Sequence, residues 1–246
     1  MQTAGVSRTI ALVGSGEYLE KSREVDEHLL SLAAGCRGAD AEPVKVACLP
    51  TAAAGDGERV WRDWSRRGVE WFTGLGADAV AVDVVSAETA DDPGLAAEVE
   101  QADLVYLSGG KPTMLHGVLD GSRAWSAIQV VLDRGGVLAG CSAGAMVQGA
   151  KIAGLRGGGE TDGFALLPGT MIIPHFDEWP SLISGLVRRV VGRGHTVVGI
   201  DGGTAMVRHG DEHRAVGIGG VEVWGPLGHR RFERELLPAG FIDPIA

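Results

Sequence analysis

The strongest constraint on how this chain can fold is a series of short, nearly continuous apolar runs. Runs without polar alternation are typical of strands buried on both faces, as in a parallel sheet. Most of them are followed by a small or glycine-rich turn and then by apolar residues at helical spacing. The predicted buried strands are 9–13, 44–50, 79–84, 103–108, the run that ends at Ser142, 170–173 and 196–201.

The predicted helices fall between these strands, over 22–34, 58–73, about 112–119 and about 122–134, with another over 179–191. Strands and helices alternate five times without a long linker, which is typical of a doubly wound α/β fold with a mostly parallel sheet. After residue 201 the pattern changes to short strands with glycine turns. We therefore expect a C-terminal antiparallel hairpin extension and a single domain over residues 1–246.

The composition excludes several classes of function. The net charge of −10 disfavours a nucleic acid partner, and the apolar runs are shorter than the roughly 20 residues that span a bilayer. The three cysteines form no C-x-x-C pair, and their odd number suits a reducing compartment. The sequence shows no signal-peptide pattern, in which basic residues precede a long apolar run, so we expect a cytoplasmic protein. The H-E-x-x-H pattern of zinc hydrolases is absent, and we expect no metal and no cofactor. The apolar helix faces could pack against a second copy of the chain, so a homo-oligomer is an open alternative.

The sequence Gly140-Cys141-Ser142-Ala143-Gly144 follows an apolar run and precedes a helix-compatible segment. This Gly-x-Ser-x-Gly pattern is typical of a nucleophile elbow, a sharp turn between a strand and a helix. We expect strained backbone at Ser142, and glycines on either side because strand and helix approach too closely there for side chains. The Ser142 hydroxyl would then project from the carboxyl end of the sheet.

A serine nucleophile needs a base within hydrogen-bond reach. Of the seven histidines, His175 alone directly follows an apolar strand and a proline, at the carboxyl end where ligands bind in open α/β sheets. We expect it to meet Ser142 there. The alternative is a histidine that only caps a local turn.

An oxyanion hole needs two N–H groups beside the nucleophile. The elbow geometry supplies the N–H of Ala143, and the Gly109-Gly110 turn after strand 103–108 is the candidate for the second. The alternative for this turn is a simple helix entry. Lys111 follows it and could hold a substrate carboxylate or point to solvent.

Four blocks in order carry a family resemblance: Leu107-Ser108-Gly109-Gly110, Gly140 to Ala145, Ile173-Pro174-His175-Phe176, and Gly199 to Ala205. Together they resemble the serine peptidases related to cyanophycinase and alpha-aspartyl dipeptidase. The resemblance implies the fold of class I glutamine amidotransferases, with Ser142 as nucleophile, His175 as general base, and Gly110 and Ala143 as oxyanion donors. It also implies cleavage of peptide bonds next to aspartate, including beta-linked ones.

The chain departs from the family pattern at two places. Cyanophycinase-like members carry Gly-Ile-Asp-Glu after the late strand, where the Glu orients the histidine, and this chain has Gly202 at that position. Asp201 is our assignment for the third catalytic residue, and the other acids that could replace the missing one are Asp177, Glu178, Glu160 and Asp162. Lys111-Pro112 stands where the family usually has other polar residues.

These observations favour a serine hydrolase that cleaves a small peptide or amide through an acyl-enzyme. The alternative is a catalytically impaired relative that binds a small molecule or partner in the same crevice, because glycine at 202 cannot orient an imidazole. A Cys141 nucleophile is disfavoured, because Cys141 precedes the elbow position by one residue and should face away from the crevice.

Overall fold

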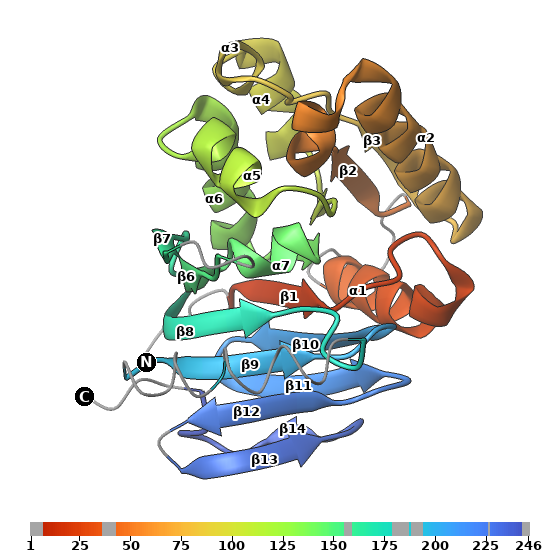
Figure 1. Ribbon diagram of the computed structural model, residues 1–246. Coiled ribbons are helices and arrows are strands. Elements are labelled where there is room, and N and C mark those ends of the chain that lie inside the picture. The colour runs from red at the N-terminus through yellow and green to blue at the C-terminus, as the bar shows by residue number, and fades with distance from the viewer. Residues whose placement is uncertain are drawn as a thin grey trace, which may run out of the picture.

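A parallel β-sheet runs through the centre of the computed structural model, which describes residues 7–35, 43–154, 159–178, 187, 194–225 and 227–242 (Figure 1). Its parallel strands are adjacent in the order β1-β5-β4-β2-β3, and β1 pairs with β5 from Thr9↔Val137 to Val13↔Cys141. The strands span β1 (Thr9–Val13), β2 (Lys45–Leu49), β3 (Asp78–Ala81), β4 (Leu104–Leu107) and β5 (Val137–Cys141). The predicted doubly wound α/β fold is confirmed.

The sheet continues beyond β1 with antiparallel strands from the end of the chain. β10 (Thr204–His209) pairs with β1, β11 (Glu212–Gly217) pairs with β10, and β14 (Leu236–Leu237) pairs with β11. β10 and β11 form the predicted C-terminal hairpin, and with β14, which was not predicted, they complete an eight-stranded sheet. The third short strand expected in this extension, 221–224, lies in the other sheet.

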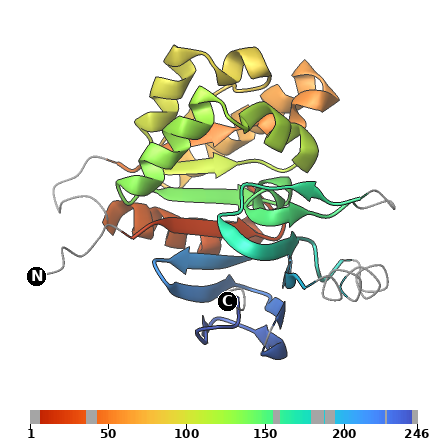
Figure 2. The same ribbon diagram turned by 90° about the vertical axis from the view of Figure 1, so that its left-hand side faces the viewer.

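A second, six-stranded sheet was not distinguished from the first in the sequence. It has the order β13-β12-β9-β8-β6-β7, with β8 parallel to both β6 and β9. Figures 1 and 2 show it beside the first sheet, at the end of the molecule away from α2 and α3. Its strands are β6 (Gly149–Ile152), β7 (Thr161–Asp162), β8 (Leu167–Ile173), β9 (Thr196–Ile200), β12 (Val221–Gly225) and β13 (Gly228–Phe232).

Helices cover both faces of the first sheet because its strands bury side chains in both directions. On β1, Ile10 and Leu12 face one apolar cluster, and Ala11 and Val13 face the other. The second cluster contains residues of α1 and α2, and the first contains residues of the later helices. The helices are α1 (Arg23–Gly35), α2 (Glu58–Gly74), α3 (Ala87–Ala90), α4 (Pro93–Glu100), α5 (Pro112–Leu119), α6 (Arg123–Asp133) and α7 (Ala143–Met146).

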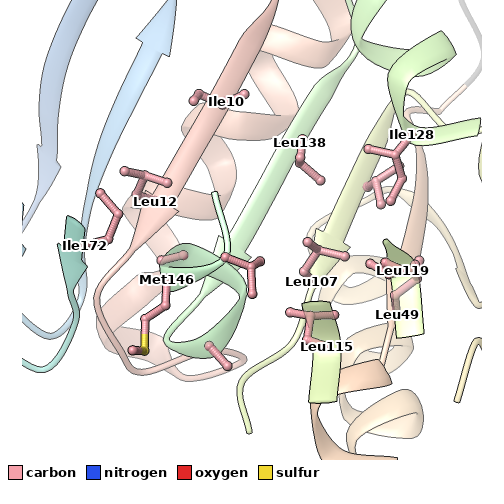
Figure 3. Packing of buried hydrophobic residues seen from close by; sticks show 14 of the residues in the cluster. Ile10, Leu12, Leu49, Leu107, Leu115, Leu119, Ile128, Leu138, Met146 and Ile172 are labelled. Carbon is pink, nitrogen blue, oxygen red and sulfur yellow. The ribbon is translucent and has the colours of Figure 1, made fainter. Parts of the chain in front are cut away.

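The first apolar cluster also joins the two sheets. Figure 3 shows Ile172 of β8 beside Leu12 of β1 and Met146 of α7, and all three side chains are buried. The second sheet is therefore packed against the carboxyl half of β1 and against α7.

The loops place their helices by ordinary capping chemistry. Pro112 is the first residue of α5, as predicted, where its missing N–H has no helical partner to lose. The Asp92 carboxylate accepts hydrogen bonds from the N–H groups of Gly94 and Leu95 at the start of α4.

The predicted helix over 179–191 lies outside the described residues except for Val187. Among the described helices, none has both the length and the apolar character needed to cross a membrane.

One buried acid joins α1 to α2. Asp26 is fully buried, and its Oδ2 accepts a hydrogen bond of 2.8 Å from the indole Nε1 of Trp71. Burial raises the pKa of Asp26 from 3.8 to about 7, and the bond from Trp71 offsets part of that rise.

We expect Asp26→Asn to change how the free energy of unfolding depends on pH. An acid whose folded pKa is raised keeps its proton in the folded state where the unfolded chain has lost it, so stability falls as pH rises between the two values. The wild type should lose on the order of a few kcal/mol between about pH 4 and pH 7 through this group, and the variant should not. Urea unfolding across this range measures the difference, and parallel curves for the two proteins would contradict it.

Candidate active site

Ser142 occupies a strained turn between β5 and α7. Its φ is 51° and its ψ is −106°, a conformation that non-glycine residues rarely adopt. The turn is fixed from both sides, since the Ser142 N–H donates to the Val13 carbonyl and the Ser142 carbonyl accepts from Ala145 and Met146. The predicted strand–turn–helix junction is therefore present, although α7 is a single turn of four residues.

The two flanking glycines are required by close backbone packing. A β-carbon placed on Gly144 would lie 2.3 Å from the Leu107 carbonyl oxygen, and one on Gly140 would lie 2.2 Å from the Gly144 oxygen. Real β-carbons do not approach oxygen this closely. The expected reason for both glycines is confirmed, and it ties the elbow to the end of β4.

His175 reaches Ser142 from the second sheet. It follows β8 with a φ of 54°, and its Nε2 lies 3.1 Å from Ser142 Oγ. The next residue, Phe176, donates its N–H to the Ile200 carbonyl at the end of β9. The two predicted side chains do meet. Ser142 follows a strand of the first sheet and His175 follows a strand of the second, so they do not lie along one sheet edge.

Glu178 supplies the acid at the other nitrogen of the imidazole. Its Oε2 lies 2.9 Å from His175 Nδ1, and its Oε1 accepts a hydrogen bond of 3.1 Å from the Ser15 hydroxyl. The Glu178 N–H also donates to the His175 carbonyl, so a tight turn brings the two side chains together. With the proton on Nδ1 facing the carboxylate, Nε2 has a lone pair for the Ser142 proton.

Asp201, the acid assigned from the sequence, points elsewhere. Its Oδ2 accepts from the Gly220 N–H at 2.9 Å and pairs with Arg231 of β13, so it holds the second sheet together. Asp177 is also engaged, since its Oδ1 accepts from the Gly202 N–H at 2.9 Å. The two remaining candidates, Glu160 and Asp162, pair with His195 and Lys151. The assignment of Asp201 beside His175 therefore disagrees with the geometry.

The space beside Gly202 is filled by two side chains from the segment after β1. A β-carbon at Gly202 would lie 2.8 Å from Ser15 Oγ and 3.0 Å from Lys21 Nζ. The Ser15 hydroxyl, which donates to Glu178, thus occupies the space that the β-carbon of a side chain at 202 would need. The carboxylate on the imidazole comes from the turn after β8 and not from the end of β9.

The Gly109-Gly110 turn lies on the other side of Ser142. Gly110 has a φ of 142°, and a β-carbon there would lie 2.5 Å from the Ala52 carbonyl oxygen, so only glycine fits. Lys111 fixes the turn by donating its N–H to the same oxygen at 2.8 Å. Within the described part of the chain, the N–H groups of Gly110 and Ala143 have no backbone acceptor, which is what oxyanion donors require.

The Lys111 side chain is directed away from the elbow. Its Nζ donates to the Gly55 carbonyl and to the Asp56 carboxylate, and the side chain is half exposed. A substrate carboxylate would have to displace Asp56 to bind it.

Glu17 is a residue of this region that the sequence analysis did not single out. It follows the glycine-rich turn after β1, and both of its carboxyl oxygens accept from the Gly109 N–H, at 3.0 and 2.9 Å. Burial raises its pKa from 4.5 to about 7. A carboxylic acid just after a buried strand, at the end of the sheet where the elbow lies, was the signal that could have identified it.

Cys141 lies beneath the elbow. Its side chain is buried, and burial raises the pKa of the thiol well above its usual value. A buried thiol that keeps its proton is a poor nucleophile, in agreement with the expectation that Cys141 faces away from the crevice.

Comparison with known proteins identifies the family. The model of peptidase family S51 matches residues 10–216. The chain belongs to this family. It is a serine peptidase-like hydrolase, as the blocks around Ser142 and His175 predicted.

Solved structures of peptidases share the fold of this S51 member. A peptidase from an acI-B1 Actinobacterium is 29% identical, with a TM-score of 0.84 over 95% of this chain and 98% of that one. A candidate Peptidase E protein from Listeria monocytogenes EGD-e is 17% identical, with a TM-score of 0.60 over 86% of this chain and 99% of that one. The second likeness shows the fold alone. No curated protein matches the chain significantly.

We expect Gly144→Ala to destabilise the protein by about 2–3 kcal/mol, because the new methyl group collides with the rigid Leu107 carbonyl. Gly117→Ala is the matched control, since Gly117 is also helical and a β-carbon there meets nothing within 4 Å. That variant should gain about 0.5–1 kcal/mol from a stiffer unfolded chain. Urea unfolding measures both, and equal effects would contradict the packing argument.

A second expectation concerns the acid at His175. Glu178→Gln should slow the reaction of Ser142 with a fluorophosphonate probe by about 100- to 10,000-fold, because the amide cannot hold the imidazole in the required tautomer. Asp201→Asn should lose stability through Arg231 and should keep a rate near that of the wild type. Intact-protein mass spectrometry follows both rates. A larger loss in the Asp201 variant would reverse the assignment.

Proposed function

We propose that this S51 member hydrolyses a small peptide or amide through an acyl-enzyme on Ser142, with His175 as the base and Glu178 as the acid that orients it. The observation that carries the proposal is the continuous chain of short contacts, 3.1 Å from Ser142 Oγ to His175 Nε2 and 2.9 Å from His175 Nδ1 to Glu178 Oε2. Nucleophile, base and orienting acid then have the mutual geometry of a hydrolase triad.

The steps follow from these positions. Ser142 Oγ attacks the substrate carbonyl carbon while its proton passes to His175 Nε2, and the carbonyl oxygen becomes an oxyanion between the N–H groups of Gly110 and Ala143. The C–N bond then breaks, and His175 gives the proton to the departing amine. Water attacks the resulting ester while His175 takes a proton from it. The bond between the acyl carbon and Ser142 Oγ then breaks, His175 returns the proton to Oγ, and the acid product leaves.

The substrate class we propose is an aspartyl or beta-aspartyl dipeptide, which is what the resemblance to cyanophycinase and alpha-aspartyl dipeptidase implies. The match to peptidase family S51 supports a peptide substrate. Lys111 is paired with Asp56, but the ammonium group of Lys21 lies near Ser15, 3.0 Å from where a β-carbon at Gly202 would stand. The positive charge of Lys21 supports a substrate that carries a carboxylate.

The alternative of a protein that only binds ligands was based on Gly202. Glu178 now offers a carboxylate at His175 Nδ1, so glycine at 202 is no longer a reason to expect an impaired site. We also propose that residues 1–246 form one domain. β9 lies in the second sheet, β10 and β11 in the first, and β12 and β13 again in the second, so the chain cannot be cut between the sheets.

Mass-spectrometric turnover of a dipeptide panel tests this function. The panel holds alpha- and beta-linked aspartyl dipeptides with neutral alanyl dipeptides as controls. We expect the wild type to cleave aspartyl members, and Ser142→Ala to cleave none of them while it unfolds at the same urea concentration as the wild type. Cleavage that persists in Ser142→Ala, or no cleavage of any member by the wild type, would contradict the proposal.

A further inference from the structure

Two consecutive residues of the loop after β1 hold two consecutive residues of the turn after β4. Glu17 accepts the Gly109 N–H with both carboxyl oxygens, and the Tyr18 hydroxyl lies 3.1 Å from Ser108 Oγ. Tyr18 has a φ of 58°, so the backbone is bent into a strained conformation where the two contacts are made. These contacts hold the peptide unit between Ser108 and Gly109, which directly precedes the unit that carries the Gly110 N–H.

The Glu17 carboxyl also lies close to the nucleophile. A β-carbon placed on Gly109 would be 2.8 Å from Glu17 Oε2 and 3.4 Å from Ser142 Cβ. A single methyl group at Gly109 would therefore touch both the Glu17 carboxyl and the Ser142 side chain. The thiol of Cys141, the residue before Ser142, bonds to the same carboxyl from below.

The surroundings of Glu17 offer it no compensating positive charge within the described interactions. Burial is the largest influence on Glu17 and raises its pKa to about 7, against the bonds from Gly109 and Cys141. Its titratable partners are acids, and all but one of them have a pKa raised above the neutral range. They are Tyr18 of the same loop, Asp26 of α1, Cys48 of β2, Tyr106 of β4 and Cys141 of β5.

We propose that Glu17 is a positioning residue of this active site, which holds the Gly109-Gly110 turn beside Ser142 and supports acyl transfer only while its carboxyl is uncharged. The inference rests on the proposed function, because it requires an oxyanion to form at Gly110 and Ala143. It adds a second ionisable group to the site, besides the His175–Glu178 pair that faces Ser142 from the loop after β8.

The sign of the effect follows from charge. Attack by Ser142 creates a negative oxyanion near the Glu17 carboxyl, in a buried region where charges are poorly screened. A neutral carboxyl leaves this oxyanion undisturbed and still accepts from Gly109, whereas a carboxylate repels it. The rate should therefore fall with rising pH as Glu17 ionises.

The test is the rate of Ser142 phosphonylation by a fluorophosphonate probe, followed by mass spectrometry from about pH 5.5 to 9. Ser142 Oγ displaces fluoride from phosphorus and His175 takes the proton, so no knowledge of the natural substrate is needed. For the wild type we expect a rate that falls by about tenfold to a hundredfold toward alkaline pH, with the midpoint of the fall near pH 7. In Glu17→Gln, which keeps an acceptor for Gly109 and cannot ionise, the alkaline fall should disappear.

Two controls complete the experiment. Asp26→Asn removes another buried acid whose pKa is raised to about 7, but one held by Trp71, and it should keep the alkaline fall. Glu17→Ala leaves the buried Gly109 N–H without its acceptor and should be slower than Glu17→Gln at every pH. A wild-type profile without an alkaline fall, or a fall that persists in Glu17→Gln, would overturn the inference alone. Absence of labelling at Ser142 at every pH would instead overturn the proposed function.

Discussion

The active site depends on how closely the backbone of the elbow packs against the end of β4. Gly144 stands so near the Leu107 carbonyl that no side chain fits between them, and this contact fixes Ser142 in a positive-φ conformation. The same strand end continues into the Gly109-Gly110 turn. One backbone packing contact thus fixes the positions of the proposed nucleophile and the candidate oxyanion donors relative to each other.

The proposed base, His175, comes from the second sheet. β8 and β9 pack beside β1 through Ile172, Leu12 and Met146, and the turn after β8 carries both His175 and Glu178. His175, like Ser142, has positive φ, so strain is stored in both partners of the 3.1 Å contact. The proposed orienting acid, Glu178, needs no further element of the fold, because a hydrogen-bonded turn over residues 175–178 positions it.

Much of this could be predicted from the sequence. The apolar runs predicted the parallel strands, because burial on both faces leaves a local pattern in the sequence. The glycines at 140 and 144 predicted the elbow, because close backbone packing there requires glycine. The division into two sheets was missed, since apolar strands such as 170–173 and 196–200 do not show which neighbour they pair with. Asp201 was placed wrongly because Arg231, its partner, is 30 residues away on a strand that local patterning did not reveal. Glu17 was missed because its role depends on burial, which the sequence does not display.

The central claim is that Glu178, and not an acid at the end of β9, completes the group around Ser142. A crystal structure of the protein after phosphonylation of Ser142 tests this claim most directly. The account predicts a phosphonyl oxygen directed at the N–H groups of Gly110 and Ala143, with His175 Nδ1 still bonded to Glu178. An imidazole turned toward Asp201 or Asp177, or a phosphonyl oxygen directed away from Gly110, would contradict it.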